Sequence, residues 1–180
     1  MFGQFVMGVT PRECGESLSG KVARLPPRYR RLARAVLRRL PHDWLGGDGA
    51  SQQPVIEWAL VVSEDIDITP HGCIVLASAT RDTFETIQCW TLTLYRRVLD
   101  ELSDMAVRWV IAHEFGYVAA RISSAFTSTE GAPFAVTDTD SNEYDNEHFR
   151  EIRERRANVC ALGWGFIEEK AAYDRELPML

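Results

Sequence analysis

The segment SDMAVRWVIAHEFGYVAARIS, residues 103–123, constrains the fold more than any other part of the chain, because it predicts one long helix. Ser103 has the residue type that caps a helix start, and Asp104 suits the positive end of the helix dipole in the first turn. The chain has 180 residues and 46% hydrophobic content, which is enough for one domain (1–180) with a substantial core around this helix.

The same helix carries the first half of a zinc-binding motif, His113 followed by Glu114. In zinc peptidases two histidines four residues apart hold the metal, and the glutamate after the first histidine acts as general base. Here Tyr117 stands where the second histidine would be, and Gly116 allows another element to pack closely against the helix. A lone histidine on a helix is more often a core residue than a ligand, so the motif needs independent support.

That support comes from ERRAN, residues 154–158, which has the Glu-x-x-Ala-Asn form of the helix that brings the third ligand in many zinc peptidases. Glu154 would reach the metal from this separate helix. Ala157, one turn later, leaves room for the first helix to approach, and Asn158 is placed to orient a ligand by hydrogen bonding.

Together, LTLYRRVLDELSDMAVRWVIAHEFGYVAA and the later RERRANVCALGWGF resemble a zincin-type metallopeptidase domain of the gluzincin kind. The resemblance covers residues 55–166. It implies an α+β fold in which a small mixed or antiparallel sheet of about three or more strands packs on an active-site helix and a C-terminal third-ligand helix.

The resemblance also implies one zinc site built from the two helices. Carried over residue by residue, the set is His113 as first ligand, Tyr117 at the second-ligand position, Glu154 as third ligand, Glu114 as general base and Asn158 as a hydrogen-bonding neighbour.

In the same family, the strand before the active helix lines the cleft and pairs with an extended substrate. The matching stretch is about residues 86–95, which we expect to be an edge strand. Its outward residues Thr91 and Thr93 are the expected contacts for a peptide or protein segment.

Tyr117 leaves three interpretations open. It ligates zinc as a phenolate, or another residue replaces it, or no tight metal binds and its hydroxyl bonds to Glu154 or His113. The candidates for replacement are His42, His71, Glu147, His148 and Glu151. We favour the third interpretation, a degenerate site with weak or no zinc peptidase activity that binds a segment along its edge strand. The alternative is an active zinc-dependent hydrolase with an atypical ligand, so one zinc ion is possible and may be absent.

The remaining pattern gives the order of elements. Residues 1–25 are expected to be partly loose, and residues 26–40 form a basic amphipathic helix. Strands are predicted at 55–62, 73–79 and 86–95, and a long acidic loop at 124–146. A final helix from residue 147 onward is expected to break near Gly163.

Charge and composition bound the partners. The net charge is −6, yet residues 21–41 carry basic side chains and no acidic ones, so we expect this helix to dock on the otherwise acidic domain. No nucleic-acid-binding motif is present, and no nucleic-acid partner is expected. The four scattered cysteines, the short apolar runs and the absence of a signal-peptide pattern predict a cytoplasmic protein without a membrane segment.

Overall fold

A computed structural model describes residues 18–41, 55–68, 74–84, 87–126 and 147–179. Its helices are α1 (Leu18–Ala23), α2 (Pro27–Leu37), α3 (Arg96–Leu99), α4 (Asp104–Phe126), α5 (Glu147–Gly163) and α6 (Ile167–Glu176), followed by a 3-10 turn at Leu177–Met179. Its strands are β1 (Val55–Ser63), β2 (Asp67–Ile68), β3 (Ile74–Val75), β4 (Ala77–Phe84) and β5 (Ile87–Tyr95).

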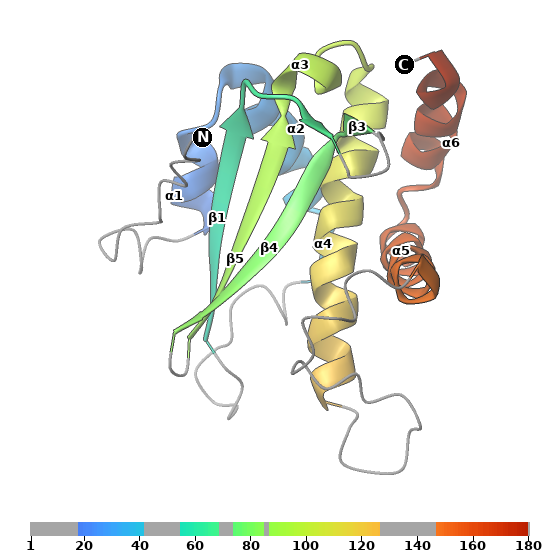
Figure 1. Cartoon of the computed structure of the whole chain (residues 1–180). Coiled ribbons are helices and arrows are strands. Elements are labelled where there is room, and N and C mark those ends of the chain that lie inside the picture. Colours follow the sequence, from blue (N-terminus) through green and yellow to red (C-terminus); the bar gives the residue numbers. More distant parts are fainter. Residues whose placement is uncertain (1–17, 42–54, 69–73, 85–86, 127–146, 180) are drawn as a thin grey trace, which may run out of the picture.

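The main sheet is mixed and has the order β1-β5-β4. Strand β5 runs parallel to β1 and antiparallel to β4, while β2 and β3 form a separate antiparallel pair. The chain is therefore an α+β protein with a small mixed sheet, as predicted. Helix α4 lies between this sheet and the pair α5 and α6 (Figure 1).

The prediction that residues 86–95 form an edge strand is wrong. This segment is β5, which is hydrogen-bonded on both sides, so its backbone has no open edge for a peptide. Among the described strands of this sheet, the edge nearest α4 belongs to β4 (Figure 1).

The side chains of β5 alternate between two faces, as the sequence predicts for a strand. Trp90, Leu92 and Leu94 are each 1% exposed and join the core formed with α2 and α4. Thr91 and Thr93 are partly exposed and lie on the opposite face of the strand. Because β5 has no open edge, the prediction that Thr91 and Thr93 lie on an edge strand is wrong.

Helix α4 begins where predicted. The Ser103 side-chain oxygen accepts a hydrogen bond from the Ala106 N–H at 3.3 Å, which is the geometry of an N-cap. The Ser103 N–H in turn donates to Glu176, the last residue of α6, at 2.7 Å. Because α4 is covered on several sides, its apolar residues extend around the helix, and Val107 and Phe115 are both fully buried.

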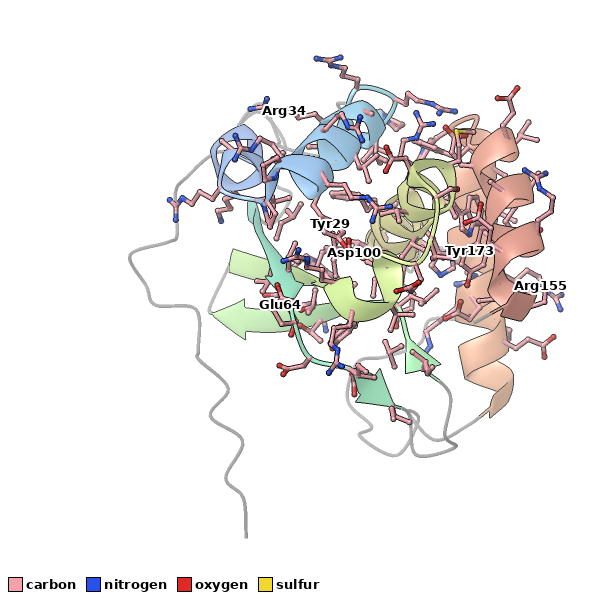
Figure 2. All side chains as sticks on the ribbon, turned by 90° about the horizontal axis from the view of Figure 1, so that it is seen from above. Tyr29, Arg34, Glu64, Asp100, Arg155 and Tyr173 are labelled. Carbon is pink, nitrogen blue, oxygen red and sulfur yellow. The ribbon has the colours of Figure 1, made fainter. Side chains whose placement is uncertain are left out.

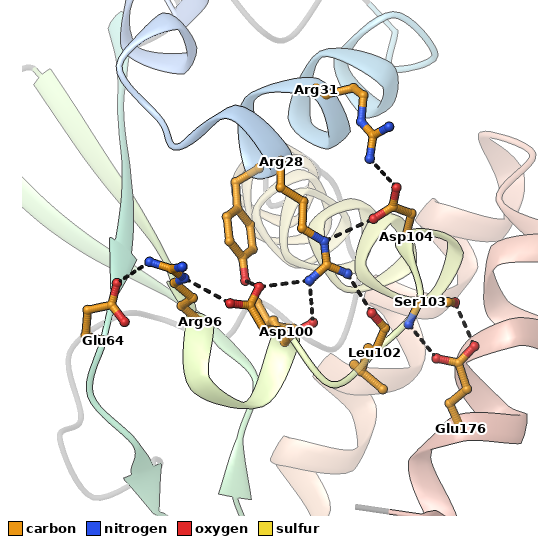
Figure 3. A network of polar contacts seen from close by, with 11 residues as sticks. Arg28, Arg31, Glu64, Arg96, Asp100, Leu102, Ser103, Asp104 and Glu176 are labelled. Carbon is orange, nitrogen blue, oxygen red and sulfur yellow. Dashed lines mark hydrogen bonds and ion pairs between the residues drawn. The ribbon is translucent and has the colours of Figure 1, made fainter.

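The basic helix α2 docks on acidic residues, as predicted. Arg28 donates hydrogen bonds to Asp100 at 2.8 Å and to Asp104 at 3.0 Å, and the Tyr29 hydroxyl donates to Asp100 at 2.9 Å (Figure 3). Partial burial raises the pKa of Asp100, but hydrogen bonds from Arg96, Tyr29 and Arg28 outweigh it and hold that pKa below its ordinary value. The network fixes α2 to the start of α4.

The final helix breaks as predicted, between α5 and α6. Gly165 lies in the break with a φ of +89°, a conformation that favours glycine. Arg39 holds the break in place: it donates to the Gly165 carbonyl, lies 3.8 Å from the Phe166 ring centre and pairs with the buried Glu169 at 2.6 Å. Helix α6 therefore runs in a different direction from α5 and packs against α4 (Figure 1).

Three boundaries differ from the prediction. Residues 18–23 form the helix α1 in a region expected to be loose, and the strand expected at 73–79 is divided into β3 and the longer β4. Helix α4 continues to Phe126, and the rest of the predicted acidic loop lies outside the described residues. No helix in the described portion of the chain is long and apolar enough to span a membrane.

Candidate functional site

Helices α4 and α5 cross closely at Gly116. A Cβ placed on Gly116 would lie 2.5 Å from the Ala157 carbonyl oxygen and 3.3 Å from the Cys160 Cβ. Only glycine fits this crossing without movement of a backbone, and Ala157 is itself fully buried. The roles predicted for Gly116 and Ala157, close approach of the two helices, are confirmed.

The crossing places His113 of α4 beside two residues of α5. Its Nδ1 atom lies 3.0 Å from Asn158 Oδ1, and its Nε2 atom lies 3.1 Å from Glu154 Oε2. The predicted neighbours of His113 are therefore in place, on opposite sides of the imidazole. The His113 side chain is 15% exposed and that of Glu154 is 54% exposed, so Glu154 stands at the rim of the site.

A hollow of about 830 Å³ lies next to this pair. Four residues from the sequence prediction line it, namely His113, Glu114, Glu154 and Asn158. Its other walls come from residues 74–77 of β3 and β4 and from residues of α6 and the following turn: Lys170, Tyr173, Asp174 and Leu177. In Figure 2, viewed from above, Tyr173 is labelled near α4, whereas Arg155 lies on the outer side of the molecule.

Sequence reasoning did not predict that α6 lines the hollow, because the resemblance ended at residue 166. The break around Gly165 was the available signal, since a helix that resumes after a left-handed glycine can turn back over its predecessor. Lys170, Tyr173 and Asp174 follow at i, i+3, i+4 spacing, which places them on one face of α6.

Glu114 and His113 are electrostatically coupled in the hollow. The pKa of Glu114 is raised to about 7, mainly by burial and also by the charge of Glu154, against the opposing charge of His113. Burial alone would lower the pKa of His113, but the hydrogen bond to Glu154, the charges of Glu114 and Glu154 and the contact with Asn158 together raise it. The site thus holds an imidazole beside two carboxyl groups.

Tyr117 is not among the residues that line the hollow. Its hydroxyl accepts a hydrogen bond from Arg153 Nη1 at 3.5 Å, rather than a bond from either of the partners proposed for it, Glu154 and His113. Arg153 precedes Glu154 on α5, so the tyrosine hydroxyl is directed to a neighbouring part of the helix crossing.

The described residues fit a conventional zinc site only in part. Tetrahedral zinc with nitrogen and oxygen ligands separates two ligand atoms by about 3.3 Å, close to the 3.1 Å between His113 Nε2 and Glu154 Oε2. However, no group of three His, Cys, Asp or Glu residues in the described part of the chain is arranged to hold a metal. Within the described residues, the structure therefore places two possible ligand atoms, His113 Nε2 and Glu154 Oε2, at the spacing of zinc ligands.

Among the described residues, none of the proposed replacements for Tyr117 is placed to supply a third metal ligand. Glu151 is exposed and pairs with Arg155 at 3.2 Å. His42 and His71 lie outside the described residues, as do the side chains of Glu147 and His148.

Comparison with known proteins gives no family for this chain. No protein-family model matches it, and neither a curated protein nor a solved structure matches it significantly. The chemistry of the hollow is therefore argued from its own residues.

Proposed function

We propose that this chain is a zincin-like domain that binds an extended segment of a peptide or protein beside its hollow and lacks conventional zinc peptidase activity. One observation carries the proposal. His113, Glu114 and Glu154 border a single hollow, whereas Tyr117, at the position of the second metal ligand, does not line it. The arrangement keeps the groups that would surround a substrate and lacks one that would hold the metal.

The edge of β4 supports a binding role. The Tyr95 N–H donates to the Leu76 carbonyl at 3.0 Å, and these two residues lie opposite each other in the register of β4 with β5. Directly opposed hydrogen-bonded pairs alternate along an antiparallel ladder. The backbone groups of Ala77 and Ala79 consequently point away from β5, where an added strand would pair with them. Ala77 also lines the hollow, so such a strand would pass its mouth.

The environment of His113 supports binding over cleavage. Both ring nitrogens have oxygen partners, at 3.0 Å on Asn158 and 3.1 Å on Glu154. A zinc site that lacks one of three protein ligands loses most of its affinity, because affinity depends on the full ligand set and its geometry. We therefore expect the contacts between His113, Glu154 and Asn158 to persist in the working protein.

A peptide-display selection with Ala79 variants tests the binding role. Random peptides are selected on the wild-type chain, and the dissociation constants of the winners are measured against Ala79→Pro and Ala79→Ser. Proline removes the outward N–H while leaving the bonds to β5 intact, and serine keeps that N–H. Binding lost in Ala79→Pro and kept in Ala79→Ser is the expected result, with far-UV circular dichroism confirming that both variants are folded. Equal binding by both variants, or no peptide selected at all, contradicts the proposal.

An active zinc hydrolase is the second candidate, and one observation favours it. The Nδ1–H of His113 can donate to Asn158, which leaves Nε2 as a ligand atom directed at Glu154. His113 and Glu154 would then hold the metal, and Glu114, with its pKa of about 7, would act as general base. Hydrolysis of a labelled casein in zinc-containing buffer tests this candidate. It requires cleavage by wild type that is lost in Glu114→Gln, and an unchanged rate in that variant excludes the mechanism.

A further inference from the structure

Two polar groups in the hollow make no hydrogen bond with the described residues. Among the residues that the structure describes, the carboxylate of Glu114 and the hydroxyl of Tyr173 have no hydrogen-bond partner, although both line the hollow. Other polar side chains there are engaged: His113 with Asn158 and Glu154, and Lys170 with Asp174. Both side chains are partly exposed at the hollow, so a ligand bound there would supply the missing hydrogen-bond partner.

The charges around these groups favour a cation. Glu114 and Glu154 border the same hollow and repel each other electrostatically, and His113 lies within reach of both. The ion pair between Lys170 and Asp174 is complete in itself and adds no net charge. The hollow therefore has an excess of carboxylate over basic groups, which a positively charged ligand group would offset.

The opposite wall is apolar. Residues 74–77, which belong to β3, β4 and the residue between them, face the helices across the hollow, and Val110 of α4 and Leu177 after α6 add apolar surface on the helical side. Ile74 is 47% exposed and Leu177 is 43% exposed, so the apolar surface continues to the mouth. A ligand that spans the hollow would thus place an aliphatic stem along this wall and its charged end beside the carboxylates.

We propose that the bound segment inserts a primary ammonium group on an aliphatic stem into the hollow, where Glu114, Glu154 and Tyr173 accept its hydrogen bonds. An ammonium has three donors and no acceptor, which matches two carboxylates and one hydroxyl. A guanidinium is planar and needs acceptors in its own plane, so it fits this arrangement less well. The inference rests on the proposed function, and it adds the chemical class of the ligand: a lysine side chain or the N-terminal amine of a chain.

Titration with three matched peptides tests the inference and separates the two sources. All are alanine-based, C-terminally amidated and titrated in buffer with EDTA, and Trp109, which lines the hollow, reports binding by its fluorescence. The first is N-acetylated with a central lysine, the second is N-acetylated with a central norleucine, and the third has the norleucine and a free N-terminus. We expect the first or the third to bind about 10- to 100-fold more tightly than the second, the range expected for charge-assisted hydrogen bonds.

Variants then assign the effect to the hollow. Glu114→Gln should remove most of the advantage of the amine, and Tyr173→Phe should reduce it severalfold while disturbing the fold least. Glu151→Gln, an exposed residue on α5 outside the hollow, is the matched control and should change nothing.

The outcomes distinguish this inference from the proposed function. Equal binding of all three peptides overturns the ammonium inference and leaves segment binding intact. An amine preference that survives both Glu114→Gln and Tyr173→Phe places the cation elsewhere and also overturns it. Failure of every peptide to bind, together with failure of the display selection, overturns both.

Discussion

Replacing Gly116 by alanine is the sharpest test of how the helix crossing builds the site. In an ordinary helix this change stabilises by about 1 kcal/mol, because alanine has the higher helix propensity. Here the new Cβ would lie 2.5 Å from the Ala157 carbonyl oxygen, closer than real Cβ contacts occur. The obstructing atom belongs to a backbone, so no side-chain rotation relieves the contact and α5 itself must move.

The size of the effect follows from these two opposing contributions. Overpacking a well-packed interior costs about 1–3 kcal/mol, and a rigid backbone contact belongs at the upper end of that range. After the propensity gain is subtracted, we expect Gly116→Ala to lower the free energy of unfolding by about 2 kcal/mol. Gly163→Ala is the matched control, since nothing lies within 4 Å of its new Cβ. That variant should be neutral or slightly more stable than wild type.

Urea denaturation followed by far-UV circular dichroism measures both variants under the same conditions. The separation of α4 and α5 should also weaken the contacts of His113 with α5, which a change in the imidazole NMR signals would report. If Gly116→Ala proves as stable as Gly163→Ala, the close crossing is not rigid and the account of how His113 and Glu154 are brought together is wrong.

Three further predictions concern charged and polar contacts. Asp100 has a lowered pKa, so its contribution to stability is present above pH 4 and is lost as the pH falls through the folded pKa. Asp100→Asn should therefore cost about 1 kcal/mol at pH 7 and flatten the loss of stability in acid, and parallel acid profiles would contradict this. Glu169→Gln should lower the free energy of unfolding in urea by about 2 kcal/mol, whereas the exposed neighbour variant Glu168→Gln should change it by less than about 0.5 kcal/mol; equal effects would show that the buried ion pair is unimportant. Asn158→Ala should lower the pKa of His113 in an NMR titration, because the contact with Asn158 raises that pKa. An unchanged pKa would show that Asn158 does not interact with the imidazole.

The sequence was most informative where one short-range rule acts alone. The cap at Ser103 follows from residue type, and the two faces of β5 follow from strict alternation. Gly116 and Ala157 predict a close helix crossing because small side chains leave room, and the structure has that crossing. Each of these features depends on a few neighbouring residues, so no knowledge of the rest of the fold was needed.

The order of the strands could not be derived in the same way. Whether β5 lies at the centre or the edge of the sheet depends on whether β1 and β4 both pair with it. No residue pattern within β5 indicates how many strands pair with it. An alternating apolar and polar strand fits either position, since its two faces differ in burial but its two edges do not. For this reason the strand that carries Thr91 and Thr93 was predicted at the edge of the sheet rather than at its centre.

The part of α6 in the hollow was missed for a related reason. Lys170, Tyr173 and Asp174 carry no motif, and they reach the hollow only because the chain changes direction at Gly165 and is held there by Arg39. The position of Tyr117 likewise depends on the rotation of α4 against α5, which its place four residues after His113 does not determine.

Zinc content of the purified chain tests the central claim most directly. The protein is prepared without a metal-affinity tag and analysed for zinc beside Tyr117→His and Glu154→Ala. We predict far less than one zinc per chain in wild type and in Glu154→Ala, whereas uptake of about one zinc by Tyr117→His would show that a histidine at position 117 can complete the site. Near one zinc per wild-type chain, lost in Glu154→Ala, would contradict the account and would mean that this site is a metal centre with an unusual ligand.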